Sequence, residues 1–197
     1  MTTTINRVYD SYGQARETVR ALEAGGVRSG DISLVANKHV SRDHADVDEV
    51  SDAAKGAGIG GALGAGAGLL AGLGLLAIPG LGPVVAVGWL ASTAVGAAAG
   101  AATGGVVGAL IDAGEKREHA HVYSEAVRRG GTLVSVRVPD AEAPRVRAIM
   151  DRYRPIDPDA RAADYRREGW SGTFDPNAPA YRPNDAEIER IRRDWAA

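Results

Sequence analysis

Residues 56–111 read GAGIGGALGAGAGLLAGLGLLAIPGLGPVVAVGWLASTAVGAAAGAATGGVVGALI and contain no Asp, Glu, Lys or Arg. Small residues recur there at every fourth position, in two series. Residues four apart share one face of a helix, and a face of small residues lets two helix backbones approach closely. We therefore predict a self-associating glycine-zipper α-helical hairpin whose faces are Gly56, Gly60, Gly64, Gly68, Gly72 and Gly88, Ser92, Gly96, Gly100, Gly104, Gly108.

The two series are separated by residues 78–83, which are rich in proline and glycine. This stretch predicts the turn of the hairpin. A helix over Gly56–Ile78 would be about 35 Å long and one over Val84–Ile111 about 42 Å long, and each could cross a hydrocarbon core of about 30 Å. Trp89 would then anchor the hairpin at the membrane interface. The expected turn residues are Pro79, Gly80, Gly82 and Pro83.

The same segment is only weakly hydrophobic. Each glycine costs about 0.8–1 kcal/mol of helix propensity relative to alanine in water, so the glycine-rich helix would not persist alone. Gly96–Gly105 has no side chain larger than threonine, so contact with lipid would gain little there. Three environments stay open for the hairpin: a bilayer, the dry interior of a soluble assembly of many subunits, and burial within one subunit.

The flanking sequence predicts a small α/β domain. Thr2–Tyr9, Asp31–Asn37 and Thr132–Val138 have the β-branched or alternating pattern of strands, and amphipathic helices follow the first and third. With a short edge strand at Pro155–Ala160, the order is β-α-β twice, which is the ferredoxin-like α+β pattern. We expect residues 1–37 and 115–160 to form this split domain, 38–55 an acidic linker, 56–111 the hairpin, and 161–197 a tail with a short helix.

The tail is polar except for a few aromatic residues. Aromatic rings bury large areas, so we expect these to anchor the tail on the protein's own surface or on a neighbouring subunit. A short helix is predicted over Asp185–Trp195. The expected anchors are Trp170, Phe174 and Tyr181.

Composition and motifs argue against catalysis and nucleic-acid binding. The net charge is only −2 and there is no cysteine, so neither a phosphate-neutralising surface nor thiolate chemistry is expected. Gly56–Gly61 matches G-x-G-x-x-G, but a polar linker precedes it and no acidic residue follows until Asp112, so dinucleotide binding is rejected. No catalytic, cofactor or metal residue is assigned.

Two groups of titratable residues are interpreted as surface features. His119 and His121 would diverge by about 200° on a helix; they lie beyond the apolar segment and would titrate near neutral pH. A group of acids and histidines in the linker fits a solvated segment better than a site for a hard divalent cation, which stays an alternative. That group is His39, Asp43, His44, Asp46, Asp48 and Glu49.

Three segments resemble a known family: Val8–Ser11 with Ala21–Leu22 through Asp31–Val35, the insert Gly68–Gly88, and Ala120–Tyr123 through Gly130–Val134. Together they are similar to the bacterial general stress protein 17M-like or heat-induced YflT-like family, over about residues 1–160. The resemblance implies a stress-linked, non-enzymatic protein with a small α/β domain split by an apolar hairpin. It assigns no catalytic or ligand residue.

The leading hypothesis is a non-enzymatic stress-response protein that forms homo-oligomers through the hairpin, inserted in the cytoplasmic membrane with the α/β domain in the cytoplasm. Its partners would be further copies of itself and membrane lipid, with no nucleic acid. The first alternative is a soluble cytoplasmic particle or filament with the hairpins in its interior. A further alternative is a small-molecule or metal sensor.

Overall fold

The computed structural model describes residues 1–37, 74–78, 82–89, 105–178 and 181, and for 74–78, 82–87 and 105 it describes the backbone alone. Several predicted features lie outside these residues: the linker 38–55, the terminal helix Asp185–Trp195, and most of the two small-residue series. Of those series, Gly88 and Gly108 are described in full. Outside are Gly56, Gly60, Gly64, Gly68, Gly72, Ser92, Gly96, Gly100 and Gly104, together with Pro79 and Gly80 of the turn.

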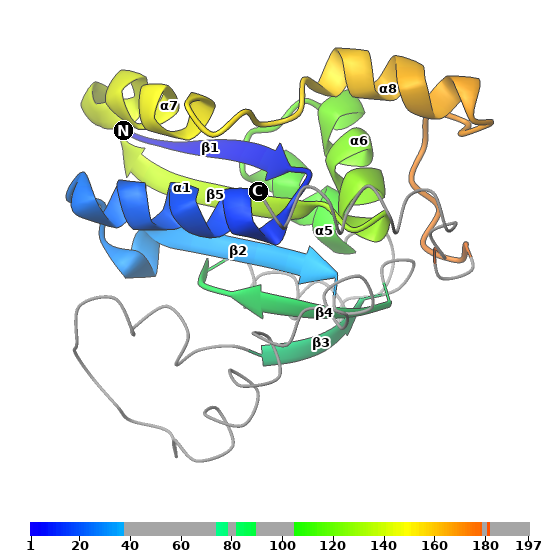
Figure 1. Cartoon of the computed structure of the whole chain (residues 1–197), viewed down its shortest axis with the longest axis horizontal. Helices are drawn as coiled ribbons and strands as arrows, with labels where there is room; N and C mark the ends of the chain where they lie inside the picture. Colours follow the sequence, from blue (N-terminus) through cyan, green and yellow to red (C-terminus); the bar gives the residue numbers. More distant parts are fainter. Residues whose placement is uncertain (38–73, 79–81, 90–104, 179–180, 182–197) are drawn as a thin grey trace.

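The fold is mixed α/β. Strands β1 (Thr2–Tyr9), β5 (Thr132–Pro139) and β2 (Ile32–Asn37) form a three-stranded antiparallel sheet, as the sequence predicted for all three strands. Two further strands, β4 (Gly82–Val87) and β3 (Gly74–Ile78), extend it antiparallel beyond β2 to the order β1-β5-β2-β4-β3 (Figure 1).

The predicted helical hairpin is therefore wrong over residues 74–78 and 82–87. These residues form a β-hairpin, in which Ile78 pairs with Gly82 and Leu76 with Val84, and β4 in turn pairs with β2. Gly82 and Pro83, which were predicted to be turn residues, belong to β4 instead. Val84, Val85 and Val87 are β-branched and favour strands, and the glycine content penalises a helix. Pro83 is tolerated because it is the second residue of β4, close to the strand's start.

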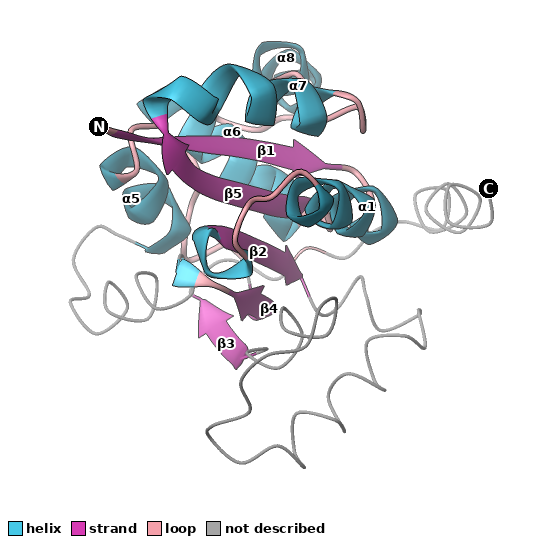
Figure 2. Cartoon of the chain, turned by 90° about the vertical axis from the view of Figure 1, so that its left-hand side faces the viewer, coloured by secondary structure: helices cyan, strands magenta, loops and turns pink. Residues whose placement is uncertain are grey.

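Helices cover both faces of the sheet (Figure 2). Helices α1 (Tyr12–Ala24) and α7 (Ala143–Asp151) pack on one face, with an apolar cluster that includes Leu22, Val134 and Met150. Helices α5 (Gly105–Asp112), α6 (Arg117–Arg128) and α8 (Pro158–Arg167) belong to a second cluster on the other face, with Val8, Val35 and Leu133. Alternate residues of β1, β2 and β5 serve the two faces, as a pleated sheet requires.

Helix α1 follows the sequence closely. The Ser11 hydroxyl accepts a hydrogen bond from the Gln14 amide and the Gln14 side chain accepts from the Ser11 amide, which makes a capping box. Ala15, Val19 and Leu22 are buried at helical spacing, as predicted. Short 3-10 turns at Ser29–Asp31 and Asp140–Glu142 lead into β2 and α7.

The edge strand predicted at Pro155–Ala160 is wrong. Asp157 instead caps α8 by accepting hydrogen bonds from the Asp159 and Ala160 amides, and Pro158 occupies the first turn, where its missing N–H costs nothing. The Ile156 amide still donates to the Val8 carbonyl at 2.8 Å. Residues 155–157 therefore lie along the outer edge of β1 without forming a strand.

Gly88 sets the path of the chain as it leaves β4. Its φ is +89°, and a Cβ atom there would lie 2.2 Å from the Ile32 carbonyl oxygen and 2.8 Å from the Ser33 Cα. Those atoms are backbone at the start of β2 and cannot move aside cheaply. Although Gly88 was assigned to the small-residue helix face, in the structure it allows a close approach of β4's end to β2.

We predict that Gly88→Ala destabilises the fold by about 2 kcal/mol or more, because it combines a left-handed φ with a backbone clash. Urea unfolding followed by circular dichroism measures this. Gly30→Ala is the matched control, since nothing lies within 4 Å of a Cβ at Gly30. Equal stabilities of the two variants would contradict the placement of β4 against β2.

Candidate functional site

The two edges of the sheet differ. Along β1, the outward-facing Val8 carbonyl accepts a hydrogen bond from the Ile156 amide at 2.8 Å, so the segment that leads into α8 occupies this part of the edge. At the opposite edge, β3 pairs on one side with β4 and, among the described residues, with no strand on its other side. An edge strand presents a row of backbone donors and acceptors to a further strand. β3 belongs to the uncharged segment, so it has none of the charged side chains that keep edge strands from pairing with another chain.

Trp89 follows the hairpin directly and lies against the domain. Its ring packs partly buried against the apolar cluster under α5 and α6, and the Arg137 guanidinium carbon of β5 lies 4.5 Å from the ring centroid. A cation over an indole face is an attractive arrangement. This residue was predicted to anchor the hairpin at a membrane interface; here it fastens the end of the hairpin to the sheet.

The uncharged segment returns to the domain in α5. Val106 and Leu110 are almost fully buried, Gly108 is half-buried, and the helix packs against α6. The described part of α5 begins at Gly105. Both described parts of the segment, β3–β4 and α5, are thus integrated into the fold around β2, β5 and α6.

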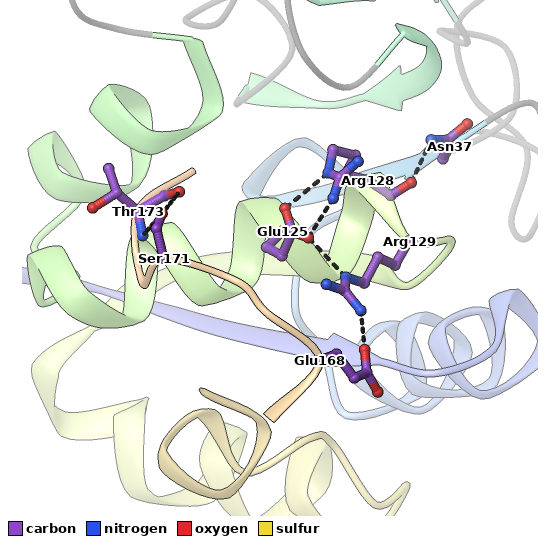
Figure 3. A network of polar contacts seen from close by, with 7 residues as sticks. All are labelled: Asn37, Glu125, Arg128, Arg129, Glu168, Ser171 and Thr173. Carbon is purple, nitrogen blue, oxygen red and sulfur yellow. Dashed lines mark hydrogen bonds and ion pairs between the residues drawn. The ribbon is translucent and has the colours of Figure 1, made fainter. Parts of the chain in front are cut away.

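A charged network lies at the end of α6 (Figure 3). The Glu125 carboxylate, 2% exposed, accepts from the Arg128 Nε and Nη2 at 2.8 and 2.5 Å and from the Arg129 Nε at 2.7 Å. Arg129 also pairs with Glu168 beyond α8, and Asn37 of β2 donates to the Arg128 carbonyl at 3.1 Å. A buried carboxylate is stable only when paired in this way. The network therefore ties α6 to α8 and to the end of β2.

Aromatic rings extend this network. The Arg129 guanidinium carbon lies 4.1 Å from the Tyr165 ring centroid. The Tyr181 ring centroid lies 5.4 Å from the guanidinium carbons of both Arg128 and Arg129. Burial opposes the charge of Arg129, but its hydrogen bonds to Glu125 and Glu168 outweigh this and raise its pKa. Trp170 meets Tyr165 edge to face at 5.9 Å. The predicted tail anchors Trp170, Phe174 and Tyr181 thus lie against the protein's own α6 and α8 region, with Phe174 8% exposed.

The two histidines of α6 point to different partners, as their spacing predicted. His119 Nδ1 lies 3.3 Å from Glu115 and its Nε2 lies 3.3 Å from Asp159 of α8. Glu115 also accepts from the Asn6 side chain at 3.0 Å, so a polar chain runs from the sheet to the surface. In the described residues no group of three His, Cys, Asp or Glu side chains could hold a metal ion.

His121 faces the segment that follows α8. Its Nδ1 accepts a hydrogen bond from the Phe174 amide at 3.2 Å. Burial lowers the pKa of His121, and the nearby Arg117 lowers it further, while Glu118 acts in the opposite sense. The sequence identified the histidine but gave no sign of this partner, because the contact joins residues far apart in the chain.

Comparisons with known proteins do not place the chain in a family. No protein-family model, no curated protein and no solved structure matches the chain. Among the helices that the structure describes, none is both long and apolar enough to cross a membrane. The linker residues of the alternative cation site, His39, Asp43, His44, Asp46, Asp48 and Glu49, lie outside the described residues.

We predict that Glu125→Ala destabilises the domain by about 3 kcal/mol, because it leaves two half-buried guanidinium groups without their shared buried carboxylate. Glu168→Ala is the control: its side chain is 56% exposed, so its loss should cost below about 1 kcal/mol. Chemical denaturation of both variants provides the comparison. A larger loss for Glu168→Ala would mean that the network is held from α8 rather than from α6.

Proposed function

We propose that this is a non-enzymatic protein that forms homo-oligomers through its uncharged segment, residues 56–111. The observation that carries the proposal is the asymmetry of the sheet. At the β1 edge, the chain's own Ile156 amide bonds to Val8, while β3, which lies in the uncharged segment, is the last strand at the other edge among the described residues. Association through an edge strand uses backbone hydrogen bonds and needs no particular side-chain motif.

The small-residue series support the same proposal in a second way. Eleven small residues in two registers of four provide faces for close backbone packing. Nine of these residues lie outside the described part of the chain, so the zipper remains our proposal for the stretches on either side of the β-hairpin. β-strand pairing and glycine-face packing are separate contacts, and each has its own test below.

We also propose a ferredoxin-like classification for the flanking domain. The strand order β1-β5-β2, with α1 and α7 packed together on one face, supports it. Residues 155–157 lie along β1, where that pattern would place a fourth strand. The domain would then be the folded body that carries the association segment, and a stress-linked role rests on the family resemblance alone.

Two of the three environments allow association through the segment: a bilayer and the dry interior of a soluble assembly. Because residues 74–78 and 82–87 are strands, the bilayer proposal no longer has the length of two continuous spanning helices behind it, whereas the abundance of small residues favours a dry protein interior. Preparation without detergent followed by high-speed centrifugation and light scattering separates them. Recovery as a large particle in the supernatant supports a soluble assembly, and recovery in the lipid fraction supports the membrane.

Two proline variants of β3 test the edge contact. Consecutive N–H groups of a strand point to opposite sides, so of Leu75 and Leu76 one faces β4 and the other faces outward. We predict that Leu75→Pro and Leu76→Pro differ: the outward one lowers the oligomer mass while the fold is kept, and the inward one weakens the hairpin. Light scattering and circular dichroism measure the two effects. If both folded variants keep the wild-type mass, β3 is not the contact.

A second set of variants tests the zipper. Replacing Gly64, Gly68, Gly96 and Gly100 together by leucine adds apolar surface but fills the small faces, and we predict loss of higher oligomers. The same four changes to alanine are the matched control, because alanine leaves the faces small. An oligomer that survives the leucine changes unaltered would rule the zipper out.

A further inference from the structure

The chain after α8 folds back over the domain as a strap, defined here as residues 169–178. The Trp170 amide donates to the Tyr165 carbonyl at 2.9 Å, which ends α8 and starts the return. Trp170 packs, partly buried, against an apolar cluster under α5 and α6. Further along the strap, Phe174 inserts into the same cluster, which contains Val106, Leu110, Val122 and Tyr165. Phe174 is 8% exposed, whereas both of its neighbours are exposed.

A single imidazole holds the backbone of the strap at this point. His121 Nδ1 accepts the Phe174 N–H at 3.2 Å. Among the described residues, the other hydrogen bonds of residues 171–178 are made within the strap itself: Ser171 with Thr173, and Asp175 with Asn177 and Ala178. The polar tie between residues 171–178 and the domain is therefore one bond to a titratable acceptor.

An imidazole nitrogen accepts a hydrogen bond only while it is unprotonated. Protonation of His121 places an N–H on Nδ1, directly opposite the N–H of Phe174, and so turns the bond into a repulsion between two donors. It also places a positive charge in a partly buried position near Arg117. Both changes act against the docked strap and neither affects the released one.

The charges around His121 do not offset this effect. On α6 itself, Arg117 opposes protonation and Glu118 favours it. From the strap, Asp175 directs its carboxylate to the Asn177 amide at 2.8 Å. Asp112, the charged residue of α5, is exposed, and Asp159 of α8 faces His119 instead. Thus α5 and the strap do not place a carboxylate on the His121 ring among the described residues.

We propose that the strap and His121 form an acid-released latch: protonation of His121 frees Phe174 and uncovers the apolar side of α5 and α6. The contact would convert a fall in pH into exposure of apolar surface. Because burial lowers the pKa of docked His121 below its ordinary value of 6.5, the released strap binds the proton more readily than the docked one. Docking is therefore strongest above pH 6.5 and weakens as the pH falls from there to the pKa of docked His121, below which it changes no further.

The chain offers a direct reporter, because Phe174 is its only phenylalanine. The full-length protein labelled with ¹⁵N-phenylalanine gives one amide resonance, that of the strap. We expect this resonance to move from a docked to a released position between pH 8 and pH 5, together with the titration of the His121 ring. A Phe174 amide that stays in place while His121 titrates would overturn the proposal.

Two variants separate His121 from the other titratable groups. His121→Asn keeps an acceptor oxygen near the position of Nδ1 but does not titrate, so Phe174 should stay docked throughout. His119→Gln removes the neighbouring imidazole and should behave like the wild type. An acid transition of Phe174 with unchanged midpoint in His121→Asn would assign the release to another group and contradict the latch.

A third measurement needs no variant. Imidazole ¹⁵N shifts of the wild-type protein at pH 8 show which nitrogen of His121 carries the proton. An unprotonated Nδ1 is the expected result, since that atom accepts the Phe174 bond. A proton on Nδ1 at pH 8 would overturn the proposal, however His121→Asn behaves.

Discussion

Both hydrogen-bonding edges of β2 are occupied, and the remainder of the structure depends on this. One edge pairs with β5 and so joins β2 to β1 and the helices; the other pairs with β4 and so brings the uncharged segment into the sheet. All six residues of β2 are buried. The backbone groups of a buried strand must be hydrogen-bonded. In a sheet of β1, β5 and β2 alone, the outer edge of β2 would lack hydrogen-bond partners, and β4 supplies them.

This constraint explains why the uncharged segment forms strands and not a helix over residues 74–78 and 82–87. A free-standing helix of such glycine content loses conformational entropy with little side-chain burial in return. As a strand, the same residues satisfy the backbone of β2 and gain their own pairing. Glycine is required at position 88, since only a residue without Cβ fits against the Ile32 carbonyl.

Much of the domain could be predicted from local signals. The alternation of Val134, Val136 and Val138 and the capping residue Ser11 were sufficient for β5 and α1. The hairpin could not be read in the same way, because a run of Gly, Ala, Leu and Val has no polar residues to reveal a period of 2 or 3.6. The available indication of a strand was the group of β-branched residues Val84, Val85 and Val87, which lies between Gly82-Pro83 and Gly88.

The sequence also indicates the start of α8, because Asp157 is a good N-cap and Pro158 a good first-turn residue. We predicted a fourth strand at this place instead.

The site residues were harder to predict from the sequence. Glu125 with Arg128 and Arg129 has the spacing of an ordinary exposed helix pair, and the sequence does not show that α8 and the tail bury it. The divergence of His119 and His121 followed from helix geometry, but the Phe174 amide did not.

The two faces of the sheet thus have different characters. The α1 and α7 face is an apolar core of local β-α units, whereas the α5, α6 and α8 face combines apolar packing with a buried carboxylate, two histidines and the returning strap. The second face is where the association segment, the charged network and the tail all meet. Changes in charge at this face can therefore affect how the tail covers the domain.

Residues 74–78 and 82–87 complete the sheet as a β-hairpin. Backbone NMR of the full chain can detect this through cross-strand NOEs for the pairs Leu34–Val87 and Leu75–Val85 together with carbon secondary shifts. We expect these NOEs and extended-strand shifts across both β3 and β4. Helical shifts over residues 74–87, with sequential amide contacts and no NOE to β2, would contradict it.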